Sequence, residues 1–282
     1  MISGYPFNIF EFLFRLNNNY MKRVKVSAII ALCCALTGWG QNNFYSQGSL
    51  HINLTSSWNT QPNGSGTEPI NFHTAGQVFY VQNGHQMTAS GSWTVSGTGS
   101  KVVVTSGGQI TSGSYNHWIL ALDLEENARY VMNHSTFSSL NFGTMHPGGI
   151  FQMNTNSGFR PTLTYPTLVL NFSGTFNQTS VKATGGVIVK SGATWRGSSN
   201  TANTHEIASI TVESGGSLEG VAGTGSCAYN INGSLLLQPG STYNANGSSG
   251  TAPVFTFSGS SGEITFAGNV LSANHNINVT GT

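Results

Sequence analysis

The sequence has few charged residues and few cysteines. Only 7% of its 282 residues are charged, whereas about 25% is usual for a soluble protein. Long surface helices need many Glu, Lys, Arg and Ala residues, so this composition excludes a mainly helical protein. Two of the three cysteines, Cys33 and Cys34, lie near the N-terminus, and only Cys227 occurs later. We therefore expect no internal disulfide beyond the leader, and stability must come from packing and backbone hydrogen bonds.

The formal net charge of +1 conceals an uneven distribution. From residue 41 onward there are six basic and eight acidic residues, a net charge of −2. A nucleic-acid-binding protein carries a basic face, so we expect no nucleic acid partner. One acid, Glu11, and four basic residues lie before residue 41: Arg15, Lys22, Arg23 and Lys25.

The N-terminal segment has the anatomy of a secretory signal peptide. A basic stretch after Met21 precedes a short apolar run, Val26 to Leu36, and Gly38 and Gly40 stand at the small-residue positions before Gln41. The apolar run is too short to span a membrane. We expect residues 21–40 to be removed near Gly40/Gln41, which predicts a secreted or cell-surface protein without a transmembrane segment in the mature chain. Residues 1–20 are predicted to be an upstream extension or a misassigned start.

Glycine (36 residues) and regularly spaced aliphatic residues form an internal repeat. Its pattern is two apolar residues two apart, a turn residue, a glycine, and a third apolar residue three positions after the glycine. Residues two apart share one face of a strand, and the glycine permits a positive φ at a corner. The copies are Phe79–Met87, Val102–Ile110, Val187–Trp195, Ile210–Leu218 and Leu235–Tyr243.

The spacing of the repeat predicts a stack of coils. The interval from Gly84 to Gly107 equals that from Gly192 to Gly215, and the stretch from Gly107 to Gly192 fits four slightly shorter periods. One such unit cannot bury its apolar face alone, whereas stacked units share a core. We predict an all-β, single-stranded parallel β-helix (β-solenoid), right-handed, with roughly ten coils in one domain, 41–282. The alternative is an antiparallel sandwich or barrel, in which turns recur about every 8–12 residues.

The segment Phe44 to Gly108 carries the most specific sequence, including FYSQGSLHINLTSSWNT and GSWTVSGTGSKVVVTSGG. It resembles the N-terminal region of large surface and secreted proteins of Bacteroidetes. The resemblance implies a repetitive β-helix, export that often uses the type IX secretion system, and an adhesin-like or scaffold role; it transfers no site residues. No C-terminal sorting domain is recognised up to Thr282. We therefore expect either a fragment of a longer product or an open stack prone to end-to-end self-association.

Few residues offer catalytic chemistry. Glycoside hydrolysis needs two well-placed carboxylates, and calcium-assisted elimination needs several oxygen ligands on one face. Asp123 and Glu125 share a strand face by spacing, with Arg129 nearby. They are the weak candidates for a catalytic site, although an isolated charge cluster is more often a solvated surface.

No cofactor or metal is expected. The histidines lack the short helical spacing and cysteine partners of a zinc site, and the Gly-rich stretches lack the Lys and helix of a phosphate loop. The histidines are His51, His73, His85, His117, His134, His146, His205 and His275.

Four tryptophans could stack on sugars if they were exposed. Trp93 and Trp195 occupy apolar positions of the repeat, so we expect them in the core, and Trp58 is expected to help close the first coil; Trp118 is left open. Two functions are therefore considered. The first is a non-catalytic extracellular scaffold or adhesin, and the second is a carbohydrate-active β-helix that binds or cleaves a polysaccharide.

Overall fold

The computed structural model describes residues 42–134, 139–178, 180–197, 202–220, 225–245, 253–272 and 276–280. The expected extension (1–20), signal peptide (21–40) and cleavage position before Gln41 lie outside the described residues. Residues 42–282 form one compact unit. Its only described helix is a single 3-10 turn, η1 (Thr55–Ser57). Within these ranges no helix has the length and hydrophobicity that crossing a membrane requires.

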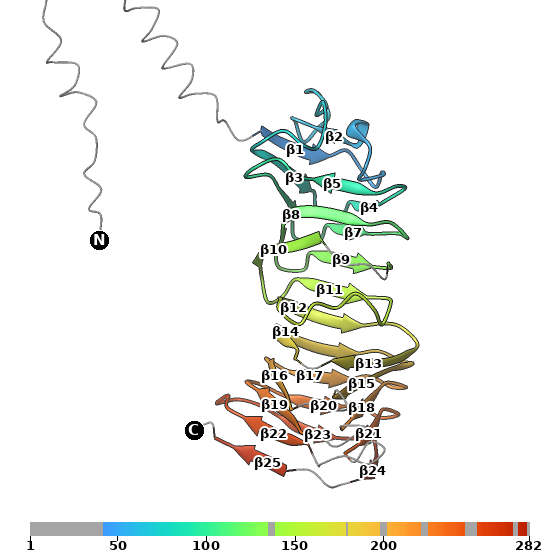
Figure 1. The fold of residues 1–282 in the computed structure, drawn as a ribbon, viewed down its shortest axis with the longest axis vertical. Helices are drawn as coiled ribbons and strands as arrows, with labels where there is room; N and C mark the ends of the chain where they lie inside the picture. Colours follow the sequence, from blue (N-terminus) through green and yellow to red (C-terminus); the bar gives the residue numbers. More distant parts are fainter. Residues whose placement is uncertain are drawn as a thin grey trace, which may run out of the picture. The chain divides into compact units, whose positions relative to one another are not determined.

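The strands form three sheets that run along the column (Figure 1). The first sheet has seven strands: β1 (Asn42–Ser46), β2 (Trp58–Asn59), β3 (Gln77–Val81), β5 (Trp93–Val95), β6 (Lys101–Val104), β8 (His117–Leu124) and β10 (Ser139–Met145).

The second sheet has thirteen strands and extends along nearly the whole column. They are β4 (Gln86–Thr88), β7 (Gln109–Thr111), β9 (Arg129–Met132), β11 (Ile150–Met153), β12 (Thr164–Leu170), β14 (Lys182–Val189), β16 (Asn203–Ile207), β17 (Ile210–Val212), β19 (Cys227–Ile231), β20 (Leu235–Leu237), β22 (Val254–Phe257), β23 (Ile264–Phe266) and β25 (Asn276–Val279).

The third sheet covers the later coils. Its five strands are β13 (Gly174–Gln178), β15 (Ala193–Gly197), β18 (Ser217–Glu219), β21 (Thr242–Asn244) and β24 (Asn269–Ser272).

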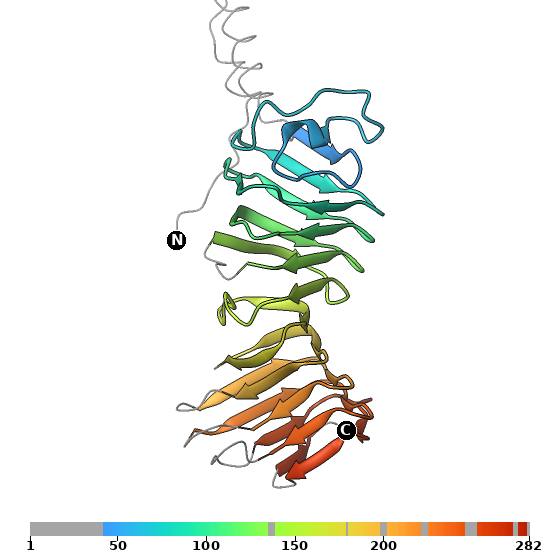
Figure 2. The same cartoon turned by 90° about the vertical axis from the view of Figure 1, so that its right-hand side faces the viewer.

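Successive coils lie on one another with their strands parallel, as predicted (Figure 2). Phe79 aligns with Val102, and Val187 aligns with Ile210, so equivalent positions of the repeat stack directly. The one antiparallel pair among the described strands joins β1 and β2. These registers confirm an all-β parallel solenoid and exclude the antiparallel sandwich.

Coil length varies more than a uniform repeat implies. Four coils separate Ile110 from Val187, and each is shorter than the coil between Gly84 and Gly107. The first coil, from Phe44 to Phe79, is clearly longer than that coil, and so is a late one, from Leu235 to Ile264. The coils near both ends of the column therefore exceed the period of the repeat, whereas the four between them fall short of it. The residues in register through the four short coils are Ile110, Tyr130, Phe151, Leu168 and Val187.

The repeat glycines form two stacked corners. Gly84 and Gly107 lie between the first and second sheets, whereas Gly192, Gly215 and Gly240 lie between the second and third sheets. All five have positive φ, between 76° and 81°, a conformation that glycine adopts without steric cost. The amide of Gly84 donates to the carbonyl of Gly107 at 3.2 Å, and Gly192 donates to Gly215 at 2.9 Å. In a shorter coil, Asn127 takes the equivalent place with φ 61°. Each corner therefore contributes its own ladder of hydrogen bonds along its part of the column.

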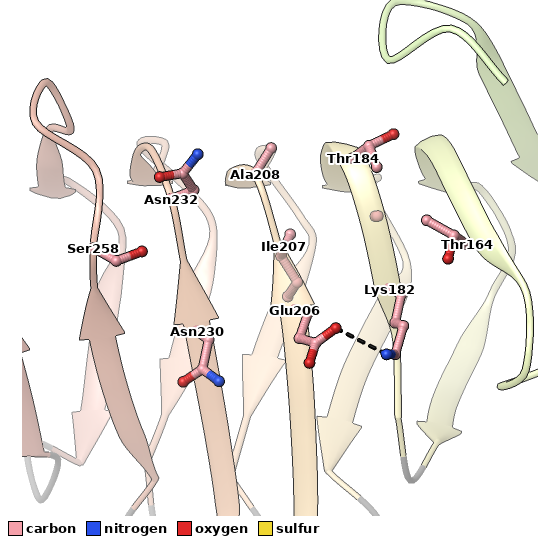
Figure 3. A pocket seen from close by; sticks show the side chains of 10 residues that line it. Thr164, Lys182, Thr184, Glu206, Ile207, Ala208, Asn230, Asn232 and Ser258 are labelled. Atoms are coloured by element: carbon pink, nitrogen blue, oxygen red, sulfur yellow. Dashed lines mark ion pairs between the residues drawn. The ribbon is translucent and has the colours of Figure 1, made fainter.

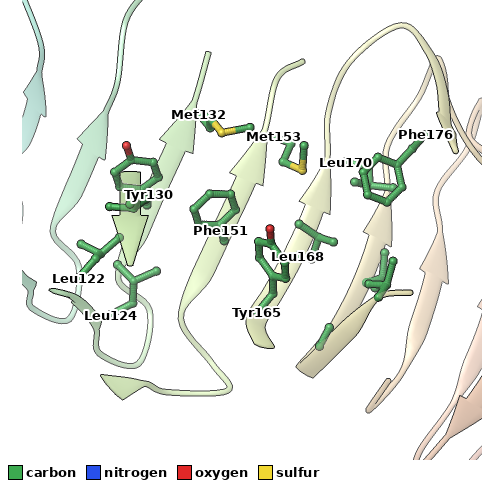
Figure 4. Packing of buried hydrophobic residues seen from close by; sticks show 14 of the residues in the cluster. Leu122, Leu124, Tyr130, Met132, Phe151, Met153, Tyr165, Leu168, Leu170 and Phe176 are labelled. Atoms are coloured by element: carbon green, nitrogen blue, oxygen red, sulfur yellow. The ribbon is translucent and has the colours of Figure 1, made fainter. Parts of the chain in front are cut away.

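Aromatic side chains stack inside the column, from one coil to the next. Tyr130 and Phe151 stack with ring centroids 5.3 Å apart (Figure 4), and Tyr229 stacks on Phe255 at 4.9 Å. Offset stacks of this kind add about 0.5–1.5 kcal/mol beyond the burial of their area. The core is thus a continuous apolar column, with its aromatic rings arranged in register.

The tryptophans behave largely as their positions in the repeat predict. Trp93 and Trp195 are buried in the core. Trp58 is fully buried and stacks on Trp93 at 5.7 Å, which closes the first coil as expected. Trp118 differs, because it lies on the outer face of β8 and is 51% exposed.

Charged side chains link the coils on the outside. Each of the four ion pairs in the described part of the chain joins a basic residue to an acid one coil further along the stack. The pairs are Lys101–Asp123, Lys182–Glu206, Lys190–Glu213 and Arg196–Glu219.

Candidate functional site

Asp123 and Glu125 line a hollow on the outside of the first sheet, which we call the acidic groove. Its volume is about 400 Å³. Asp123, Glu125 and a third acid, Glu126, meet here, together with Lys101 and His146. The groove also includes Tyr80, Val103, Leu124 and Thr144.

Strand alternation places Asp123 in this groove. Leu122 and Leu124 point into the core, so Asp123 between them points outward. Parallel register aligns Tyr80 with Val103 and Val103 with Asp123, so one outward column crosses three coils. The chain therefore presents Asp123 on a wall made by its neighbouring coils rather than at an isolated corner.

The carboxylate of Asp123 is already occupied. Lys101 Nζ lies 2.7 Å from Oδ2, and the amide of Thr144, in the following coil, donates to Oδ1 at 2.7 Å. The residue is only 8% exposed. Charge-assisted hydrogen bonds of this kind are about twice as strong as neutral ones. Asp123 thus ties three coils together.

The close approach of the next coil to Asp123 requires a glycine. A Cβ atom at Gly143 would overlap Asp123 Oδ1. The bare backbone of β10 at this position allows the carboxylate to reach the Thr144 amide. Gly143 therefore belongs to the structural arrangement around Asp123.

Two further polar side chains at the groove also bond to the protein, whereas Glu126 is exposed and makes no hydrogen bond among the described residues. Glu125 Oε2 accepts the amide of Ser106 at 3.0 Å, which joins neighbouring corners. His146 Nδ1 accepts the amide of Gly148 at 3.1 Å, which closes a local turn. A general acid or base must reach the proton that it transfers, and these contacts engage Glu125 and His146 in structural roles.

Lys101 carries the clearest electrostatic effect of the groove. Its hydrogen bond to Asp123 raises the pKa of Lys101 above the usual value of 10.5, although partial burial opposes that rise. The ammonium group therefore stays charged at physiological pH. A permanently charged lysine beside a carboxylate neutralises that carboxylate and supports it structurally.

Arg129 lies apart from the two carboxylates with which its sequence position groups it. It begins β9 in the second sheet, where it aligns with Gln109 and Ile150, and it does not line the acidic groove. Its Nε is buried and has no hydrogen-bond partner in the described part of the chain. Lys101 occupies the cationic position beside Asp123 instead.

Sequence reasoning missed Lys101, although a signal for it exists. Lys101 and Asp123 are separated by one period of the repeat, and both occupy outward positions of consecutive coils. Thr144 could not have been found in this way, because it contributes a backbone amide, which carries no sequence signature.

Two histidines belong to the core. His117 and His205 are buried, and burial lowers the pKa of His117 to about 4 and that of His205 to about 3. His205 Nδ1 accepts the amide of Val181 at 3.1 Å, so its proton is on Nε2. Among the described residues, no group of three or more His, Cys, Asp or Glu side chains is arranged to hold a metal ion.

A second hollow, which we call the polar groove, lies on the outside of the second sheet and has a volume of about 480 Å³ (Figure 3). Hydroxyl and amide side chains make up half of its lining residues, and its two charges, Lys182 and Glu206, pair with each other at 2.9 Å. The two grooves thus differ in charge and in how far their polar groups are already bonded.

Comparison with known proteins gives no family: no family model, no curated protein and no solved structure matches the chain.

Proposed function

We propose that this protein is a non-catalytic extracellular surface scaffold of the adhesin type. The observation that carries the proposal is the state of Asp123, whose two carboxylate oxygens are bound by Lys101 and by the Thr144 amide. A catalytic carboxylate must be available to the substrate. In the groove that gathers three acids, the central acid instead joins coils.

The rest of the surface supports the same role. All four ion pairs of the described residues join one coil to the next, and the core is continuous from Phe44 to Phe257. Stacked repeats of this kind form a quasi-one-dimensional structure with an extended outer surface. Such a column suits the display of side chains at a distance from a cell surface.

The location outside the cell rests on the leader. The basic, apolar and small-residue regions of 21–40 are those of a signal peptide, and the resemblance of 44–108 to exported Bacteroidetes proteins supports the type IX route. N-terminal sequencing of the secreted protein should begin at Gln41. Recovery of the chain only inside cells, with residues 21–40 retained, would contradict export.

A carbohydrate-active enzyme is the second candidate, and one observation favours it. Asp123, Glu125 and Glu126 do meet in one groove, as a polysaccharide hydrolase or lyase would need. The test incubates the purified protein with a panel of polysaccharides, with and without calcium, and measures reducing ends and unsaturated products. We expect no product. Product formed by the native chain and lost in Asp123→Ala would overturn the scaffold proposal, provided that the folded fraction of the variant is matched.

A further inference from the structure

The polar groove has the composition of a binding surface rather than of a structural joint. Thr184, Asn230, Asn232 and Ser258 are all exposed in it. The side chains of Asn230, Asn232 and Ser258 make no hydrogen bond within the described part of the chain, in contrast to the bonded groups of the acidic groove. Their amide and hydroxyl groups are therefore free for a ligand.

The residues of the groove form two rows that cross several coils (Figure 3). Lys182 aligns with Glu206, and Glu206 aligns with Asn230. The second row passes through Ala208 and Asn232, whose backbone amides donate to the preceding coil. Together the lining residues come from five coils, those of β12, β14, β16, β19 and β22. Neighbouring strands lie about 4.8 Å apart, so the groove runs for roughly 20 Å along the column.

The groove continues into an apolar part. A third hollow of about 350 Å³ shares Thr164 and Thr184 with the polar groove. Phe142, Met145 and Leu163 line it, and each of them is only partly buried against the core. A ligand that follows the whole groove therefore meets hydroxyl and amide groups along one stretch and an aromatic and aliphatic surface along the next.

Charge narrows the class of ligand. Lys182 and Glu206 neutralise each other, and among the described residues no other charged side chain lines either hollow. A strongly anionic or cationic polymer would find no compensating charge and would lose hydration on binding. The groove instead matches a long uncharged molecule with many hydroxyl groups and apolar ring faces.

We propose that the polar groove and the hollow beside it bind an uncharged polysaccharide lying along the column. Hydroxyl groups of the sugar exchange hydrogen bonds with Asn230, Asn232 and Ser258, and the apolar face of a ring packs near Phe142. This inference deepens the proposed function by naming the ligand of the scaffold, and it rests on that function for the protein to meet such a polymer outside the cell.

The test is affinity electrophoresis of the purified full chain through gels that contain one soluble polymer each. Galactomannan, a mixed-linkage β-glucan and a soluble α-glucan represent uncharged polysaccharides, and polygalacturonate and alginate represent acidic ones. We expect retardation by at least one uncharged polymer and none by the acidic ones. Retardation by none of the three uncharged polymers, or only by the acidic ones, overturns the inference.

Two groove variants and one control locate the site. Asn230→Ala/Asn232→Ala should bind about tenfold more weakly, as expected for the loss of two hydrogen bonds. Ala208→Leu keeps both asparagine side chains but fills the groove between Thr184 and Asn232, and it should also weaken binding. The control is Asn177→Ala, which removes an exposed amide from β13 in the third sheet and should bind as the native chain does. Unchanged binding in both folded groove variants overturns the inference.

Failure of this inference can be distinguished from failure of the proposed function. Binding to a polymer is measured on purified protein, whereas export and absence of catalysis are measured separately by N-terminal sequencing and product analysis. A protein that is exported and inactive, but binds a peptide or no polymer, remains a scaffold with a different ligand. Release of sugar products from a retained polymer would keep the binding site and overturn the scaffold.

Discussion

The acidic groove and the polar groove are built from the same kind of coil, yet they differ in how their central polar side chains are bonded. Asp123 is bonded within the protein, whereas the asparagines of the polar groove are available to a ligand. In the acidic groove, Asp123 is 8% exposed and both of its oxygens are bonded. In the polar groove, the Lys182–Glu206 pair is about half exposed, and the side chains of Asn230 and Asn232 bond to nothing among the described residues. The number of charges in a hollow is therefore a poor guide to its function, and the state of each polar atom is a better one.

The buried histidines provide the test with the largest expected effect, because each groove has one of them on a strand that lines it. His117 is on β8 with Asp123, and His205 is on β16 beside Glu206. Burial lowers the pKa of His117 to about 4 and the pKa of His205 to about 3. The unfolded chain takes up these protons as the pH falls below about 6.5, whereas the folded chain resists them.

The stability of the fold should consequently be intact above about pH 6.5 and should be lost as the pH falls towards the folded pKa values. At pH 4 each histidine should cost on the order of 3 kcal/mol, since one pKa unit corresponds to about 1.4 kcal/mol. Urea unfolding of His205→Phe and His117→Phe, each followed from pH 8 to pH 4, measures the two regions separately. A slope unchanged by both substitutions would show that neither histidine controls the acid response.

Removing the central carboxylate should reveal the structural role of the acidic groove. Asp123→Ala leaves Lys101 without its carboxylate and the amide of Thr144 without its acceptor. Breaking such a partly buried, charge-assisted contact should cost about 2–3 kcal/mol. Urea unfolding at pH 7 measures this loss. A change below about 0.5 kcal/mol, the range of an ordinary surface substitution, would mean that the carboxylate is not a structural joint, and it would reopen the question of a catalytic role.

Gly143→Ala tests the same joint from the other side. The added methyl group would overlap Asp123 Oδ1, and overpacking of this kind costs about 1–3 kcal/mol. If the clash is specific, Asp123→Ala/Gly143→Ala should be no less stable than Asp123→Ala alone, because the carboxylate is then absent. Additive losses in the double mutant would place the strain elsewhere.

The smallest effect is expected in the polar groove. Glu206→Gln breaks an ion pair whose two side chains are 45% and 56% exposed. Exposed pairs of this kind contribute about 0–1 kcal/mol, so the free energy of unfolding should change by less than about 0.5 kcal/mol. The matched measurement is Asp123→Ala under the same conditions. Equal losses in the two variants would remove the distinction between the grooves.

The sequence predicted the architecture because the determinants of the coil are local. The pair of inward aliphatic residues and the turn glycine recur at Gly84, Gly107 and Gly192, and each of these glycines has positive φ. Four shorter coils do separate Ile110 from Val187. The prediction that Gly192 continues the corner of Gly107 was wrong, because the third apolar position of one copy aligns with the first of the next, which moves the glycine to the corner between the second and third sheets. The lengths of individual coils were less predictable, because the corners in the first coil and in the later coils do not follow the period.

The sites were less predictable because they depend on which residues of different coils become neighbours. Asp123 and Glu125 were identified as a pair, and they do line one groove. Their expected companion Arg129 lies in another sheet, since the chain turns a corner between Glu125 and β9. The polar groove has no sequence motif. Asn230 and Asn232 contribute to it only because residues of the neighbouring coils lie beside them.

The variable coil length has a practical consequence. Between Phe151 and Leu168 the chain completes a turn with about half the length of peptide that it uses between Phe44 and Phe79, yet both coils keep their parallel register. The extra residues are accommodated between strands, where they leave the pairing above and below undisturbed. Such a column can therefore gain or lose peptide at its bends and change what it displays while its interior stays the same.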